Sequence, residues 1–179
     1  MSRKNRGFQC KEAILKALQE GYRSIITEKF NGNPLEALKN FDSIAEESLR
    51  EILLSHYSEE KSRHQAWKSC KGILYEYAVF ICLKEIIERD EKLNSKIGII
   101  RGNEALLLKE YREQIVIKNW QDILPDVDII LIDKESNSVI AIISCKTSLR
   151  ERLTETAFWK RELIRKIYSV GDLEELFKH

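Results

Sequence analysis

The sequence predicts an α+β fold, an αβα sandwich in which a mixed central sheet of about four strands is flanked by helices. Apolar residues recur at helical spacing through the first half, short β-branched segments begin near residue 96, and a helical pattern returns near residue 153. At 179 residues the chain is long enough to bury one core. We therefore expect a single domain over 1–179, with a helical N-terminal part over 1–60 and a catalytic core over 61–170.

Three helices are expected in the first half, over 13–26, 35–54 and 58–89. Asn33 suits the N-cap of the second helix and Pro34 its first position, because the cap accepts free N–H groups and proline lacks one. Gly72 lies inside the third stretch, and glycine weakens a helix interior. The third stretch is therefore less certain to form one continuous helix.

Strands are expected where β-branched residues replace the helical pattern. Residues 96–101 suit a strand, Asn103 a cap for a short helix through 105–107, and residues 115–117 a further strand. The segments 127–132 and 139–143 are apolar on both faces, so both are expected to be central strands covered on both sides. The polar turn between them makes an antiparallel hairpin, and a last helix should run from about 153 to 168.

Composition excludes several classes of protein. Thirty basic and 29 acidic residues give a net charge of +1, so a nucleic-acid partner would be held by a local basic patch. Cys10, Cys70, Cys82 and Cys145 show no metal-ligand spacing and are expected to be reduced. No apolar run approaches about 18 residues, and the basic start leads into no apolar segment. We expect a cytoplasmic protein with no membrane partner.

The hairpin brings chemically useful side chains together. If the turn is centred on Ser136, residues whose numbers sum to 272 face one another, so Asp126 opposes Lys146 and Asp128 opposes Ser144. Strand alternation then places the two carboxylates on one face of their strand, and the hydroxyl and the ammonium on one face of the other. A shift of one residue in the register would break this arrangement.

Carboxylates beside a lysine suit phosphodiester hydrolysis. Hard oxygen ligands hold Mg²⁺, which polarises a phosphate and activates water, and Asp126 suits that role. Lys146 suits the orientation of water and the stabilisation of developing negative charge. The alternative is structural: Asp126 would simply begin a strand, and Lys146 would reach solvent along its stem.

Pro125-Asp126, followed by Ser144-Cys145-Lys146, resembles the signature of the PD-(D/E)xK nucleases. The resemblance implies Mg²⁺-dependent cleavage of DNA, with the Cys145 carbonyl as a metal ligand. The stretch 144–152, with the following Phe158-Trp159-Lys160, is similar to a segment of type II restriction endonucleases. That similarity implies double-stranded DNA as substrate, a short cleavage site and, for a palindromic site, a homodimer.

Ser144 stands at the acidic position of the signature, and it remains among the candidate catalytic residues. In some members of the superfamily a glutamate from a neighbouring helix replaces this carboxylate. The stretch 71–76 is similar to the helix that often carries an additional metal-binding glutamate, so Glu76 is the first candidate. Behind it come Glu155, Glu151 and Asp128.

The residues after the signature are candidates for DNA contact, although they equally suit a solvated helix start. They are Thr147, Ser148, Arg150, Arg152 and Lys160. Two other functions remain open. One is a junction-resolving, repair or nicking nuclease with the same core, which would differ in its preference for branched over plain duplex DNA. The other is a catalytically inactive DNA-binding protein, which would bind without cutting.

Overall fold

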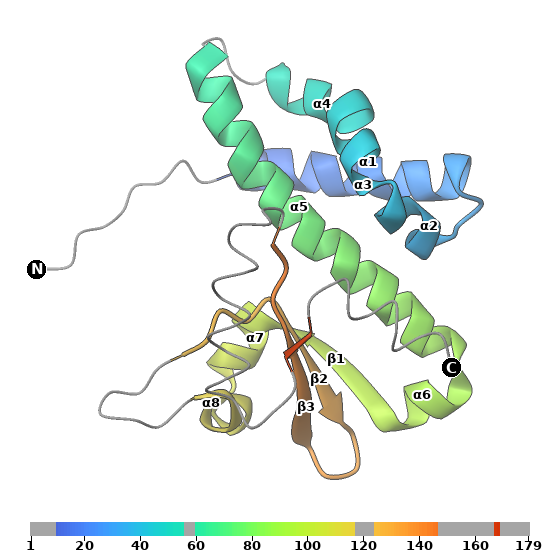
Figure 1. Ribbon diagram of the computed structural model, residues 1–179, viewed down its shortest axis with the longest axis vertical. Helices are drawn as coiled ribbons and strands as arrows, with labels where there is room; N and C mark the ends of the chain where they lie inside the picture. Colours follow the sequence, from blue (N-terminus) through green and yellow to red (C-terminus); the bar gives the residue numbers. More distant parts are fainter. Residues whose placement is uncertain (1–9, 56–59, 117–123, 147–166, 169–179) are drawn as a thin grey trace, which may run out of the picture. The chain divides into compact units, whose positions relative to one another are not determined.

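The computed structural model describes residues 10–55, 60–116, 124–146 and 167–168 (Figure 1). The chain divides into two compact units, Met1–Cys82 and Leu83–His179. Each unit is described below by itself. Within the described ranges, no helix has the length and apolar character needed to cross a membrane.

The first unit is helical, as predicted. Helix α1 (Glu12–Lys29) buries one face because its apolar residues recur every three or four positions. Tyr22 is completely buried there and makes an edge-to-face contact with Phe41, with ring centroids 5.9 Å apart. The core of this unit contains residues from every helix of the bundle: Ile14, Leu18, Tyr22, Ala37, Phe41, Leu49, Leu53, Trp67 and Leu74.

The second predicted helix is divided into four pieces. Asn33 caps α2 (Pro34–Lys39) as expected, since its side chain accepts from two free backbone N–H groups and Pro34 takes the first position. Beyond the break at Asn40 come α3 (Phe41–Ser43), a π-helical segment η1 (Ile44–Leu49) and α4 (Arg50–Leu54). The apolar residues keep a helical spacing through all four pieces. The spacing therefore gave no sign of where the helix type changes.

Helix α5 (Glu60–Arg89) is continuous, and Gly72 does not interrupt it. Its first part belongs to the first unit and its last turns to the second. Cys70 on this helix forms a disulfide with Cys10, which corrects the expectation that all four cysteines are reduced. The 60-residue separation between these two cysteines gave no sign of their proximity. Cys82 and Cys145 are buried and are not part of a disulfide.

A charged network joins α5 to the π-helical segment. Lys71 contacts Asp42 at 3.0 Å and Glu46 at 2.9 Å, and Glu46 also accepts from Trp67 Nε1 at 3.0 Å. Burial alone would raise the pKa of Glu46, but the hydrogen bonds from Lys71 and Trp67 and the charges of Lys71 and Arg50 outweigh it, so the pKa is lowered. For the Lys71 ammonium, burial opposes the charge, but both acidic partners favour it and the pKa is raised.

The second unit contains the sheet, which confirms the α+β class. Strands β1 (Ile97–Arg101), β2 (Ile129–Asp133) and β3 (Ser138–Ile143) are antiparallel neighbours in that order. The two-residue β4 (Ile167–Tyr168) pairs in parallel with β3, where the last predicted helix was expected to end. The rest of that predicted helix lies outside the described residues.

Short helices flank the first strand. Helix α6 (Glu91–Lys96) precedes β1, and α7 (Gly102–Leu107) and α8 (Lys109–Ile115) follow it. The predicted strand over 115–117 is wrong at its first residue, because Ile115 ends α8 and is completely buried. The predicted Asn103 cap is also wrong, because α7 begins one residue earlier, at Gly102.

The hairpin of β2 and β3 has the predicted register next to the site. Ile129 pairs with Ile143 and Leu131 with Ala141, so the paired numbers sum to 272. Nearer the turn, Ile132 pairs with Val139, and the sum falls to 271 because of a β-bulge. The strand expected to be covered on both faces is 44% exposed at Ile140, the extra residue of this bulge.

One face of the sheet is covered by α7 and α8. Ala105, Tyr111 and Ile115 from these helices form a buried cluster with sheet residues that include Ile130 and Ile142. The turn between β2 and β3 is held to α8 by polar contacts: Tyr111 Oη donates to Asn137 Oδ1 at 2.7 Å, and Asn137 adopts a positive φ of 55°. Helix α8 therefore holds both the face and the turn of the hairpin.

Candidate active site

The segment that carries Pro125 and Asp126 is not part of β2. The sequence placed a strand from residue 127, but β2 begins at Ile129 and the chain bends at Asp128. Val127 packs into the same cluster as Ile130, so strict two-residue alternation does not continue through the bend. The predicted placement of Asp126 and Asp128 on one strand face therefore does not describe this segment.

Gly102 fixes the backbone at this bend. Its N–H donates to the Asp128 carbonyl at 2.8 Å. A Cβ at Gly102 would lie 1.8 Å from the Val127 carbonyl oxygen and 2.5 Å from its carbon, which is far inside van der Waals contact. Only glycine allows the start of α7 to approach the segment before β2 this closely.

The ladder between β2 and β3 ends beside the site. The Asp128 N–H donates to the Ile143 carbonyl at 3.1 Å. Beyond this hydrogen bond, the next backbone N–H donates to a side chain and not to the backbone of the partner strand. The Asp128 carboxylate accepts from the Cys145 backbone N–H, with 2.5 Å between Oδ2 and N. Asp128 thus joins the two segments that carry the signature residues.

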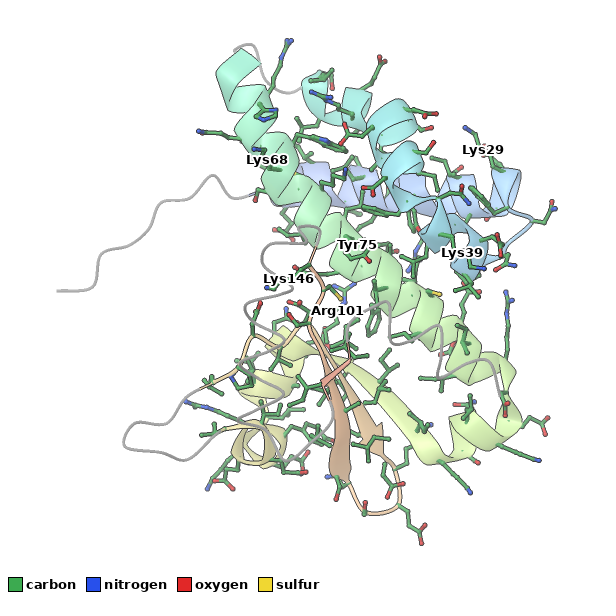
Figure 2. All side chains as sticks on the ribbon, in the orientation of Figure 1. Lys29, Lys39, Lys68, Tyr75, Arg101 and Lys146 are labelled. Atoms are coloured by element: carbon green, nitrogen blue, oxygen red, sulfur yellow. A yellow bond between two sulfur atoms is a disulfide. The ribbon has the colours of Figure 1, made fainter. Side chains whose placement is uncertain are left out.

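Asp126 and Lys146 form an ion pair across the end of the hairpin. The Lys146 side chain is 19% exposed and that of Asp126 is 45% exposed, so the carboxylate is open to solvent while the lysine is mostly covered. Arg101, labelled with Lys146 in Figure 2, ends β1 at the same end of the sheet, because it pairs with Ile129 and Ile129 pairs with Ile143. The predicted proximity of Asp126 and Lys146 is confirmed.

Ser144 and Cys145 lie between the ladder and Lys146. The Ser144 hydroxyl oxygen is buried and has no hydrogen-bond partner within the described part of the chain. Cys145 is 6% exposed and is not part of a disulfide. A buried hydroxyl without a partner is uncommon in proteins and often marks a place where a water or an ion binds.

The donors at this end of the sheet suit a hard cation in kind. Asp126 and Asp128 offer carboxylate oxygens, and the opposite segment carries the buried Ser144 hydroxyl, which has no hydrogen-bond partner among the described residues. Among the described ranges, no group of three or more His, Cys, Asp or Glu side chains is placed to hold a metal ion. These oxygen donors fit Mg²⁺ in chemistry, and a full set needs a further ligand.

Glu76 was the first candidate for that ligand. It lies on α5 in the first unit and is half-buried, whereas Asp126 and Lys146 belong to the second unit. Its role remains a prediction. The other candidates, Glu151 and Glu155, and the predicted DNA contacts Thr147, Ser148, Arg150, Arg152 and Lys160 lie outside the described residues.

Sequence reasoning missed Gly102 and the role of the Asp128 carboxylate. The sequence did contain one signal for Gly102, since a glycine directly after a β-branched segment often marks a close backbone approach. No pattern indicated that an aspartate side chain would accept from the backbone of the opposite segment. That contact depends on the bend at Asp128.

Known proteins similar to this chain are restriction enzymes. Residues 107–168 match the family model of BsaWI restriction endonuclease type 2, a range that includes Asp126 and Lys146. The "Probable type II restriction enzyme HpyAORF263P" of Helicobacter pylori is 27% identical over 161 residues, which cover 81% of this chain and 83% of that protein. No solved structure matches the chain.

A second relative is the "Putative type II restriction enzyme MjaVIP" of Methanocaldococcus jannaschii. It is 31% identical over 104 residues, which cover 56% of this chain and 46% of that protein. The residues that match the family model include Asp126 and Lys146, which the structure brings together. The comparisons therefore show that the chain is similar to type II restriction endonucleases.

Proposed function

We propose that this chain is a Mg²⁺-dependent endonuclease that hydrolyses phosphodiester bonds of double-stranded DNA at a short specific site. The observation that carries the proposal is the ion pair of Asp126 with Lys146 at the end of the hairpin. Both residues lie inside the range that matches the restriction endonuclease family. The two named relatives are type II restriction enzymes by description, which supports DNA as the substrate.

The proposed chemistry divides the work between the two residues. Bound Mg²⁺ would polarise a phosphate oxygen and lower the pKa of a water molecule. Asp126 would hold the cation, together with the Cys145 carbonyl and a further carboxylate, for which Glu76 is the first candidate. Lys146 would orient the attacking water and stabilise negative charge on the phosphate, without a covalent intermediate.

The test is cleavage of unmethylated phage-sized duplex DNA, with Mg²⁺ or with EDTA. We expect discrete fragments from the wild type with Mg²⁺ only, and none from Asp126→Ala or Lys146→Ala. Lys71→Ala is a matched control, because the Lys71 side chain is equally exposed at 19% and is also paired with carboxylates. Loss of cutting in that control as well would contradict a specific role for Lys146.

A non-catalytic DNA-binding protein of the same fold is the second candidate. Ser144 at the acidic position favours it, because a serine hydroxyl is a poorer ligand than a carboxylate. Binding of duplex DNA without Mg²⁺-dependent cutting by a folded wild type would support this candidate and contradict the nuclease. Cutting of a four-way junction but not of a plain duplex would support a junction-resolving enzyme.

We also propose that the enzyme acts as a homodimer, because a palindromic site matches a two-fold axis. Sedimentation of the protein with and without a duplex that contains its site tests this. A monomer in both states would contradict it. The basic residues Arg150, Arg152 and Lys160, with Thr147 and Ser148, are the proposed DNA contacts, and replacement of the three basic residues should weaken binding most at low salt and make it less dependent on salt.

A further inference from the structure

We propose that Asp128 is a positioning residue rather than a metal ligand: its carboxylate holds the Cys145 backbone so that Lys146 lies opposite Asp126. The inference rests on the proposed nuclease function. It assigns different tasks to the two aspartates of the segment 126–128, which sequence reasoning treated as alternative metal ligands.

The first argument is the end of the ladder. Beyond the pair of Ile129 with Ile143, the two segments no longer pair as strands. Cys145 is 6% exposed, so its N–H needs a partner inside the protein. The Asp128 carboxylate is that partner, at 2.5 Å. Charge-assisted hydrogen bonds of this kind are short and stronger than those between neutral groups.

The second argument is that the backbone of Asp128 is itself fixed on two sides. Its N–H donates to Ile143 at 3.1 Å, and its carbonyl accepts from Gly102 at 2.8 Å. A larger residue cannot replace Gly102 without a shift of the backbone, because its Cβ would overlap Val127. The Asp128 carboxylate therefore extends from a backbone position that is held by Gly102, directly after β1, and by Ile143, the last residue of β3.

The third argument is the place of this contact relative to the ion pair. Cys145 directly precedes Lys146, and Asp128 follows Asp126 by two residues. The contact of Asp128 with Cys145 therefore lies directly beside the contact of Asp126 with Lys146. If the Asp128 carboxylate turned away from Cys145 toward a cation, it would leave the Cys145 N–H without this acceptor, which is costly for a buried amide.

The test compares Asp128→Asn with Asp128→Ala. Asparagine keeps a side-chain oxygen that can accept from the Cys145 N–H but lacks the charge that a Mg²⁺ ligand needs. Alanine has neither. For a positioning residue, we expect Asp128→Asn to keep cleavage within about 3-fold of the wild type, and Asp128→Ala to lose at least about 10-fold. The Mg²⁺ concentration for half-maximal cleavage should be unchanged in Asp128→Asn.

Two further measurements do not depend on cleavage. The Cys145 amide should stay protected from hydrogen exchange in Asp128→Asn and lose protection in Asp128→Ala. The midpoint of thermal unfolding should fall by roughly 2–10 °C in Asp128→Ala and by much less in Asp128→Asn. Asp126→Asn is the matched control: as the proposed metal ligand, it should lose cleavage while the Cys145 amide stays protected.

The proposal is overturned if Asp128→Asn loses cleavage as fully as Asp128→Ala while its Cys145 amide remains protected. That result would make the Asp128 charge itself necessary at the metal. An unprotected Cys145 amide in the wild type would overturn it as well. A wild type that cuts no DNA would overturn the proposed function instead, and amide exchange would still decide whether Asp128 holds Cys145.

Discussion

The two units each contain a lysine paired with a carboxylate, and the two pairs differ in what surrounds them. The side chains of Lys71 and Lys146 are equally exposed, at 19%. Lys71 lies in a helical unit and contacts two acidic residues, one of which also accepts from Trp67. Lys146 lies past the end of a strand, two residues after Ser144, whose buried hydroxyl has no hydrogen-bond partner in the described part of the chain.

This difference teaches how to separate a structural lysine from a catalytic candidate when burial and pairing are alike. The network around Lys71 satisfies the groups that it joins and connects two helical segments. The groups around Lys146 lie where regular hydrogen bonding stops, and the carboxylate of its partner Asp126 is 45% exposed. An open carboxylate beside a covered lysine is what the proposed division of work between Asp126 and Lys146 requires.

The largest expected effect separates the two lysines directly. Lys146→Met should lower cleavage by about 10²- to 10⁴-fold, the usual contribution of a positioned proton-transfer group, and leave thermal stability nearly unchanged. Lys71→Met should leave cleavage within about 2-fold, since a surface pair contributes little beyond local stability. Steady-state cleavage rates and unfolding midpoints of both variants provide the measurement. Equal losses of cleavage in both would contradict the distinction.

The next effect concerns two glycines. Gly102→Ala should lower the free energy of unfolding by about 2–4 kcal/mol, because its Cβ would overlap the Val127 carbonyl. Gly72→Ala has open space around the new Cβ and lies within α5, so it should raise the free energy of unfolding by about 0.5–1 kcal/mol. Urea denaturation of the two variants measures both values. A destabilised Gly72→Ala would show that α5 needs this glycine for another reason.

A smaller effect is expected in the network of the first unit. Glu46→Gln should lower the free energy of unfolding by about 1 kcal/mol, because the amide keeps an acceptor for Trp67 and loses the charge that attracts Lys71. The half-exposed Glu36, which pairs with Lys39 within one helix, is a control: Glu36→Gln should cost about 0.5 kcal/mol or less. Denaturant unfolding compares the two, and an equal cost would contradict the network's importance.

The smallest effect is a dependence on pH. Because the folded-state pKa of Glu46 is lowered, its contribution to stability is complete above its ordinary value of 4.5 and is lost as the pH falls through the lower folded-state pKa. The loss should be below about 1 kcal/mol, since the side chain is partly exposed. Unfolding between about pH 3 and pH 7 should show a shallower acid limb in Glu46→Gln than in the wild type. Parallel curves would contradict the contribution of this carboxylate.

Much of the hairpin could be predicted because its causes are local. The strands and the turn follow from apolar segments around a short polar turn, whereas the register that faces Asp126 with Lys146 also depends on the bulge at Ile140, which the sequence did not indicate. Helix α1 and the Asn33 cap of α2 were predicted for the same reason. Patterns of this kind report which residues are buried and where a helix can begin.

The parts that were missed depend on contacts between distant segments. The disulfide joins residues 60 positions apart, and the contact of Gly102 with Val127 exists only once β1 lies beside β2. The sequence predicted a strand at residue 128, but the chain bends there. At this bend the Asp128 backbone forms hydrogen bonds with Gly102 and with Ile143. Hydrophobic periodicity contains no information about such contacts.

The bulge at Ile140 determines which residues of β3 lie opposite which residues of β2. The polar turn alone gives paired numbers that sum to 271, which would match Asp126 with Cys145. One inserted residue changes the sum to 272 and gives that place to Lys146. If Ile140 paired with Leu131 instead of standing outside the ladder, the sum would stay at 271 and the Cys145 thiol would take the place of the ammonium, although no residue of the sequence had been altered.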